Sequence, residues 1–321
     1  MAKKDSSLRS TAALLLVTAL VSCAPQIGKA RGPGAARREI PVELHGGVVM
    51  VPVKVGQSRV LRIVLDTGMG FDGVLLYEPL PESTFPGPLA EVRIPGAGAG
   101  EPARGLMTES GSFSAGPVQF NGQRVVWLTD TLMHGFPSDG VMGYSLLGHW
   151  IVEIDYDRKM MVLHEPGTFK PDYSWTVVPM VLHKNSTPWV KLRASLVSDE
   201  PQELDCYLDL ADDLEVVFLV RDDAKFKVPD ALEPLYLGRG LSGDVYGSKG
   251  RAALLELDTF QFKDVPVAFA PDSVRSKQPG ADAVIGGLLG RFNTIYDYAG
   301  GRLYLKPRKS NYADPAKEME P

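Results

Sequence analysis

The sequence predicts a mainly β protein built from two similar halves. Short stretches that alternate apolar and polar residues, such as 49–55, 59–66, 124–130 and 160–165, are separated by glycine and proline turns. Long amphipathic helices are absent, and only 144–150 and 288–292 are expected to form a helical turn or two. A set of similar segments also occurs twice in the same order, which indicates an internal repeat.

The repeat is clearest near the end of each half. Residues 139–166 match residues 282–307, because each segment runs from an Asp through apolar residues and Gly to a Leu-Leu-Gly turn and an Asp-Tyr hairpin. Residues 118–128 and 260–270 are also alike. Asp66 precedes Asp139 by the same number of residues as Asp209 precedes Asp282. The repeat therefore pairs Asp66 with Asp209.

The first residues read as a secretory signal followed by a tether. A basic start and a short apolar run end in Leu-Val-Ser-Cys at Cys23, which resembles the lipobox of bacterial lipoproteins. That resemblance implies lipidation at Cys23; the alternative is a secreted protein whose Cys23 lies in the discarded signal. The expected divisions are a signal peptide (1–22), a tether (23–40), two lobes (41–170 and 171–307) and a flexible tail (308–321).

Composition excludes several classes of function. The net charge of −5 argues against a nucleic-acid surface, and the five histidines are scattered without metal-ligand spacing. We therefore expect no metal, no other cofactor and no nucleic-acid partner. Cys206 is the only other cysteine, so no disulfide framework is expected, and Cys206 is interpreted as a small buried residue.

The stretch 63–76 contains two overlapping motifs. Gly68, Gly70 and Gly73 spell the G-x-G-x-x-G pattern of a dinucleotide-binding turn, whereas Asp66-Thr67-Gly68 spells the pattern around a catalytic aspartate. A dinucleotide turn must be followed by a helix. Four prolines between residues 79 and 88 exclude that helix, so the glycine pattern is interpreted as incidental.

The Asp-Thr-Gly stretch, together with the two later segments beginning at Asp139 and Asp282, resembles the aspartic protease superfamily. The absence of pepsin-type disulfides and the short lobes favour its bacterial retropepsin-like branch, here with both lobes in one chain. The resemblance covers residues 47–307 and implies a two-lobed aspartic-protease fold with a pseudo-two-fold repeat. It implies that Asp66 and Asp209 form a dyad, one carboxyl protonated and one ionised, that activates water against a peptide bond.

The resemblance also assigns supporting residues. Thr67 is expected to hydrogen-bond across the lobe interface, and Gly68 to let the backbone approach the carboxylates. The second half departs from the pattern, since Asp209 is followed by Leu210 and Ala211 where the first half has Thr and Gly. This departure leaves open whether the two carboxyls become coplanar.

Two glycine-rich segments are expected to form flaps over the site. They are residues 108–116 and 238–250, with Phe113 and Tyr246 as candidate substrate contacts. Residues 95–105 are expected to be only a flexible connection.

The sequence as a whole thus predicts an aspartic endopeptidase-like lipoprotein that acts on peptide or protein substrates. It is expected to be a monomer, because the lobes pair within one chain, and to be anchored in the bacterial envelope facing the periplasm, at the outer membrane rather than the inner. The alternative is a non-catalytic relative that binds peptides or another envelope component, supported by Leu210-Ala211.

Overall fold

The computed structural model describes residues 38–80, 87–184, 186–197, 200–275 and 279–309. Strands make up 55% of the described residues and helices 4%, which confirms the mainly β prediction. The predicted signal peptide, the lipidation site Cys23 and most of the predicted tether and tail lie outside the described residues. Cys206 is buried, as expected.

Two eight-stranded sheets have the same strand order. In the first, neighbours run β2 (Glu43–His45), β3 (Val48–Val55), β4 (Val60–Leu65), β9 (Gly140–Met142), β5 (Gly73–Leu76), β8 (Val118–Leu128), β7 (Ala103–Ala115) and β6 (Ala90–Ile94). In the second they run β13 (Val181–Leu182), β14 (Pro188–Ser195), β15 (Gln202–Leu208), β20 (Ala283–Ile285), β16 (Val216–Val220), β19 (Phe260–Pro271), β18 (Gly243–Leu257) and β17 (Glu233–Gly240). Each position in one order therefore has a counterpart in the other.

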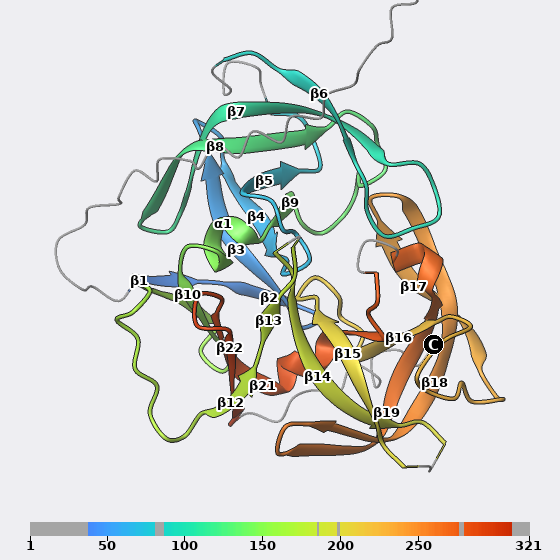
Figure 1. Cartoon of the computed structure of the whole chain (residues 1–321). Helices are drawn as coiled ribbons and strands as arrows, with labels where there is room; N and C mark the ends of the chain where they lie inside the picture. Colours follow the sequence, from blue (N-terminus) through green and yellow to red (C-terminus); the bar gives the residue numbers. More distant parts are fainter. Residues whose placement is uncertain (1–37, 81–86, 185, 198–199, 276–278, 310–321) are drawn as a thin grey trace, which may run out of the picture.

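A third sheet of six strands is shared between the halves. Its order is β1 (Arg38–Pro41), β11 (Met160–His164), β10 (Ile151–Asp155), β21 (Phe292–Asp297), β22 (Arg302–Pro307) and β12 (Thr176–Pro179). The antiparallel pair β10 and β21 joins residues 38–164, the first half, to residues 176–307, the second half. In Figure 1 the first eight-stranded sheet lies in the upper part, the second at the lower right and the shared sheet at the lower left.

The helices are short, as the sequence predicts. They are α1 (Tyr144–Leu147) and the 3₁₀ turns η2 (Asp272–Arg275) and η3 (Gly287–Arg291). The helix α1 and the turn η3 follow β9 and β20, so they occupy equivalent places in the two halves.

One large hydrophobic cluster includes side chains from all three sheets. Ile63 and Leu208 contribute from the two eight-stranded sheets, and Ile154 and Leu303 contribute from the shared sheet. Strand β4 shows why these segments form strands, because its residues alternate between exposed and buried at its start and become buried where it enters the core. Burial in one common core couples the halves into one molecule.

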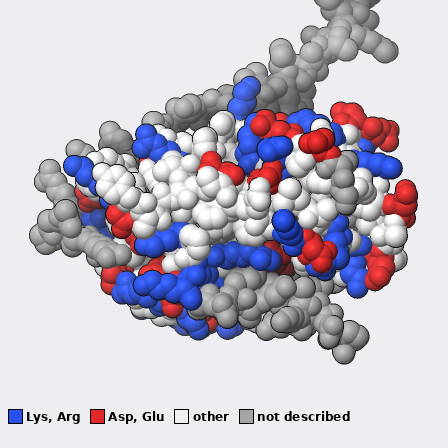
Figure 2. Space-filling view, turned by 90° about the horizontal axis from the view of Figure 1, so that it is seen from below, with Lys and Arg blue, Asp and Glu red and all other residues white. Residues whose placement is uncertain are grey.

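Charged side chains are mixed on the face seen from below Figure 1. Figure 2 shows Lys and Arg interspersed with Asp and Glu around a band of uncharged residues, so neither sign covers this face. Such a surface does not favour binding to a polyanion there.

An aspartate precedes β9 in the first sheet and β20 in the second, and its carboxyl hydrogen-bonds to the backbone of the neighbouring strand. In the first half Asp139 accepts a hydrogen bond from the amide of Arg62 (2.7 Å) and pairs with the guanidinium of Arg59. Burial alone would raise the pKa of the Asp139 carboxyl, but the hydrogen bonds from Arg59 and from the Arg62 amide hold this pKa below its ordinary value.

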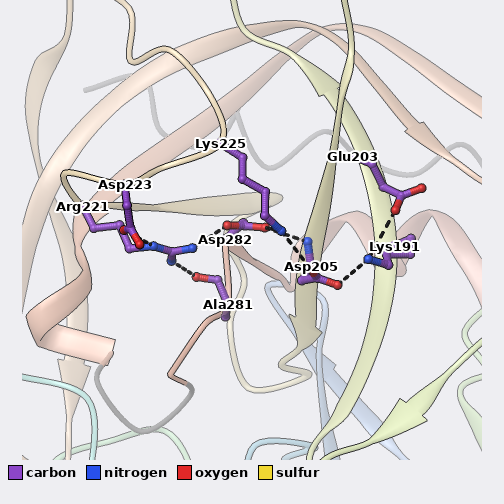
Figure 3. Close-up of polar contacts among 8 residues, drawn as sticks. All are labelled: Lys191, Glu203, Asp205, Arg221, Asp223, Lys225, Ala281 and Asp282. Atoms are coloured by element: carbon purple, nitrogen blue, oxygen red, sulfur yellow. Dashed lines mark hydrogen bonds and ion pairs between the residues drawn. The ribbon is translucent and has the colours of Figure 1, made fainter.

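The equivalent aspartate of the second half is more deeply buried. Asp282 accepts a hydrogen bond from the amide of Asp205 (2.9 Å) and forms ion pairs with Arg221 (2.6 Å) and Lys225 (2.7 Å). Figure 3 shows that this network continues through Asp205 to Lys191. The charge of Asp282, which is inaccessible to water, is therefore balanced by two cations.

Candidate active site

Asp66 follows β4 at the centre of the first sheet. Its amide donates to the carbonyl of Met142 (2.8 Å), and its carbonyl accepts from the amide of Met69 (3.3 Å), which closes a turn. The amide of Gly68 donates to Asp66 Oδ1 (2.7 Å). This backbone donor fixes the carboxyl, which remains partly exposed to water.

Asp209 is held in the same way after β15. Its amide donates to the carbonyl of Ile285 (3.0 Å), and its carbonyl accepts from the amide of Asp212 (3.2 Å). The amide of Ala211 donates to Asp209 Oδ1 (3.1 Å). We call residues 66–73 the Asp66 turn and residues 209–216 the Asp209 turn, since the two segments have the same backbone pattern.

The two carboxyls lie close together beside Gly68. A Cβ atom at Gly68 would lie 3.0 Å from Asp66 Oδ1 and 3.7 Å from Asp209 Oδ2, so the two oxygens are no further apart than the sum of these distances. Gly68 allows this approach because it has no side chain there. At the equivalent position, Ala211 is exposed and its methyl group is accommodated.

Thr67 joins the two turns through a buried hydroxyl, which is 1% exposed. Its Oγ1 donates to the carbonyl of Leu208 (2.7 Å) and accepts from the amide of Leu210 (3.0 Å), so it binds the backbone on both sides of Asp209. The Leu210 side chain packs in the large hydrophobic cluster. The predicted contact across the halves is therefore made to backbone groups, and Leu210 needs no hydroxyl to receive it.

The two acidic residues after Ala211 behave as turn residues. Asp212 Oδ1 accepts from the amide of Leu214 (3.0 Å), and Asp213 extends to the β2–β3 turn at Gly46. Atoms packed around Asp213 and the negative charge of Asp212 raise the pKa of Asp213, while nearby His45 lowers it.

A glycine packs beneath each turn. A Cβ at Gly143 would lie 2.1 Å from the carbonyl oxygen of Asp66, and a Cβ at Gly286 would lie 2.4 Å from that of Asp212. Beside Gly143, Ser145 Oγ accepts from the amide of Gly73 (2.6 Å) and donates to its carbonyl (2.8 Å). The repeated segments 143–149 and 286–291 thus support the turns that carry Asp66 and Asp209.

Each supporting segment also supplies a basic side chain to its turn. His149 Nε2 lies 2.7 Å from Asp72 Oδ2, and Arg291 makes two hydrogen bonds to the Glu215 carboxylate (3.1 and 3.0 Å). Sequence reasoning missed these pairs. The signal for them was present, because each acid follows its catalytic candidate by the same spacing and each basic residue follows Leu-Leu-Gly.

Comparison with known proteins assigns no family to this chain. No family model matches it, and no curated protein matches it.

Two buried tyrosines lie near Asp66. Burial, followed by the negative charge of Asp66, raises the pKa of both Tyr77 and Tyr298 above the ordinary range. Their phenols therefore remain neutral at physiological and acidic pH. Sequence reasoning did not single out either residue.

The predicted flap at 108–116 is wrong, because most of this segment lies inside strand β7 and pairs with β8. Phe113 is 0% exposed and stacks on Phe120 with ring centroids 4.7 Å apart, so it cannot contact a substrate. Gly111, one of the glycines that suggested a flap, lies where the pairing register between β7 and β8 shifts. A side chain at this position would collide with Val125.

The hairpin tip of the first half is instead formed by residues 95–102, between β6 and β7. The prediction that residues 95–105 are only a flexible connection is wrong, because residues 103–105 belong to β7 and the tip contacts the second half. The amide of Ser242 donates to the carbonyl of Ala97 (2.8 Å), and the amide of Gly100 donates to the carbonyl of Ser242 (2.7 Å). A Cβ at Gly98 would lie 2.4 Å from the Ser242 carbonyl, so glycine is required for this contact.

The segment 238–250 does form a hairpin, from β17 and β18, whose tip holds Leu241 and Ser242. Leu241 packs against an apolar cluster of the first half that includes Met69, and Ala97 packs against a cluster of the second half that includes Val245. The two tips therefore exchange apolar contacts between the halves.

Tyr246 lies on the other face of this hairpin. It is 63% exposed and packs edge-on against Tyr236, with ring centroids 5.4 Å apart, whereas the adjacent Val245 faces the second-half cluster. This orientation gives no support to a substrate contact by Tyr246.

Neither a metal cluster nor a membrane-spanning helix is found in the part of the chain that the structure describes. Over these ranges, no group of three or more His, Cys, Asp or Glu side chains could hold a metal ion. No helix within them is long and apolar enough to cross a membrane.

Proposed function

We propose that this chain is an aspartic endopeptidase of the retropepsin-like type, with both lobes in one chain and Asp66 and Asp209 as its catalytic dyad. The observation that carries the proposal is the approach of both carboxyls to Gly68. The position of the two carboxyls on equivalent turns of a repeated fold supports the proposal, because a dyad of this kind shares one proton.

The proposed chemistry uses water as the nucleophile. One carboxylate takes a proton from the water as it attacks the amide carbonyl, while the other carboxyl, protonated, donates to the carbonyl oxygen. As the C–N bond then breaks, the first carboxyl passes its proton to the leaving nitrogen, and the other carboxyl takes a proton back from a hydroxyl of the intermediate. Amide donors from Gly68 and Ala211 hold the two side chains in place during these transfers.

Partial exposure of Asp66 and Asp209 supports a role for water at the site. The neutral phenols of Tyr77 and Tyr298 add no competing negative charge beside Asp66. A polypeptide substrate would require the contact between the tips at Ala97 and Ser242 to open, because these tips join the halves on the side where Leu241 meets the Met69 cluster.

The proposal includes the envelope location implied by Cys23. A lipid at Cys23 would hold the protein at the outer membrane, facing the periplasm, with residues 23–40 as a tether. The two lobes are proposed to span residues 41–170 and 171–307, and the protein to act as a monomer.

The experiment that tests this function is hydrolysis of an unfolded protein and of a peptide library by purified protein across pH. Activity is expected at acidic to mildly acidic pH, where one carboxyl is protonated and the other ionised. Asp66→Asn and Asp209→Asn should each abolish it. Asp212→Asn is the matched control, since this side chain bonds within its own turn.

A second candidate is a peptide-binding protein without catalysis, favoured by the apolar Leu210 in the second turn. The same preparation distinguishes the two functions. Absence of cleavage at every pH, together with equal peptide affinity of the parent and Asp209→Asn, would replace the proposed enzyme with this binding protein.

A further inference from the structure

We propose that His149 is a positioning residue that holds the Asp66 turn through Asp72 more firmly when its imidazole is protonated. The first half-site would then be better ordered in acid than near neutrality, while the second half-site would not change. The link to hydrolysis rests on the proposed function, whereas the effect on the turn does not.

The pair lies at the far end of the Asp66 turn. His149 Nε2 is 2.7 Å from Asp72 Oδ2, and the two side chains are 23% and 21% exposed. The next residue, Gly73, is gripped at its amide and carbonyl by Ser145. Because Gly73 is held in place, a movement of Asp72 would shift the residues before it, which lead back to Asp66.

The equivalent pair of the second half cannot lose its charge in this way. Glu215, which is 4% exposed, accepts two hydrogen bonds from the guanidinium of Arg291. An arginine stays protonated at every pH at which proteins fold, whereas histidine is the side chain that ordinarily changes charge between about pH 5 and 8. The repeat thus places a permanent cation under one turn and a titratable one under the other.

Within the part of the chain that the structure describes, few charged or titratable groups face His149. Asp72 contacts it from the turn, and the Tyr144 ring meets it edge-on from α1, with centroids 5.7 Å apart. Strand β5 presents no charged side chain, and Glu153 of the adjacent β10 is paired with His164 (2.7 Å). Asp72 is therefore the group that responds to the charge of His149.

The expected response follows from the strength of the contact in its two states. Protonated imidazole both donates a hydrogen bond to the carboxylate and attracts it as an opposite charge, whereas neutral imidazole keeps only the hydrogen bond. Asp72 Oδ1 is buried and has no hydrogen-bond partner among the described residues, so little else compensates for the loss.

Hydrogen exchange of the full chain tests this proposal without relying on activity. Protection factors, corrected at each pH for intrinsic exchange, would be compared for residues 66–73 and 209–216. In the parent, protection of the first segment relative to the second should fall about three- to tenfold between acidic and neutral pH, as expected for weakening a partly buried ion pair. His149→Arg should remove this fall. A parallel fall in the parent and His149→Arg overturns the proposal.

A reciprocal variant keeps the test decisive should His149→Arg fail to fold. Arg291→His should make protection of residues 209–216 depend on pH, and no such dependence would contradict the proposal. His164→Gln serves as control, because its pair with Glu153 lies in the shared sheet. Hydrolysis by His149→Arg is measured separately. If the variant keeps its activity closer to neutral pH than the parent does, the effect extends to the proposed enzyme. If the parent shows no hydrolysis at any pH, the proposed function fails, but the exchange result stands.

Discussion

The two halves have the same strand order, yet the turns that carry Asp66 and Asp209 are held by different chemistry. In the first turn the Thr67 hydroxyl reaches across to two backbone groups beside Asp209, and in the second turn Leu210 packs into the hydrophobic cluster. The difference teaches that the second half does not need a hydroxyl at position 210, because the Thr67 hydroxyl of the first half already makes both hydrogen bonds between the turns.

The aspartates that precede β9 and β20, Asp139 and Asp282, also differ, and here the second half has the more polar, charged contacts. Asp139 is 21% exposed and pairs with a guanidinium that is itself mostly in water, whereas Asp282 is 0% exposed and has two cations. The second half therefore has the apolar turn but the more deeply buried ion network. Substitutions in matched pairs can show how much each half depends on these features.

The largest expected effect on stability comes from Asp282→Ala. Removal of one member of a buried ion network leaves the others uncompensated, and the expected cost is about 3–5 kcal/mol in the free energy of unfolding. Asp139→Ala, its counterpart, should cost about 1–2 kcal/mol, because Arg59 is free to return to water. Urea unfolding of both variants measures the difference, and equal costs would show that burial does not distinguish the two aspartates.

The Asp139 contribution should also depend on pH. Its folded-state pKa is lowered, so its stabilisation is present above the ordinary carboxyl pKa of about 4 and is lost as pH falls through the lower folded-state value. Unfolding of the parent and Asp139→Asn should therefore converge in strong acid. A constant difference down to that range would exclude a charge effect.

Thr67→Val tests the contact between the turns and should have an intermediate effect. Valine has nearly the same shape but leaves the carbonyl of Leu208 and the amide of Leu210 without this partner, at an expected cost of about 1–3 kcal/mol. Leu210→Val is the matched control, because it removes one methylene and should cost about 1 kcal/mol without disturbing those bonds. The proposed peptide hydrolysis, measured as kcat/KM, should fall further in Thr67→Val than in Leu210→Val.

The smallest effect is expected from making the turns alike. Leu210→Thr with Ala211→Gly gives the second turn the Asp-Thr-Gly sequence of the first. It should raise kcat/KM of the proposed hydrolysis by no more than about tenfold, equivalent to about 1.4 kcal/mol. The gain is limited because Thr67 already joins the halves and the Ala211 methyl is accommodated. A loss of stability without a gain in activity would show that Leu210 is needed as a core residue.

The sequence predicted that the chain consists of two similar halves. It also predicted that Asp66 and Asp209 pair, since both follow strands that occupy equivalent places in the repeat. Thr67 was also predicted to bond across the halves. The identity of its acceptor and donor was not, because backbone groups of Leu208 and Leu210 carry no sequence signal. Their positions depend on how two strands far apart in the chain meet.

The hairpin tips show where sequence patterns failed. Glycines at 96, 98 and 100 resemble a linker, but each meets residue 241 or 242 of the other half at a distance that excludes a side chain. Phe113 lies in an equally glycine- and serine-rich stretch, yet alternation along β7 buries it. Amino-acid composition therefore does not distinguish a hairpin tip from a strand with a bulge, whereas the strand pairing in the structure does.

The central claim is that the carboxyls of Asp66 and Asp209 act as one unit built from both halves. The most direct test is kcat/KM for peptide hydrolysis by the parent, Asp66→Asn, Asp209→Asn and the double variant. A shared proton predicts that each single variant loses as much activity as the double variant, so that the losses do not add. If one single variant keeps substantial activity, or if the two losses add in the double variant, the dyad account is contradicted.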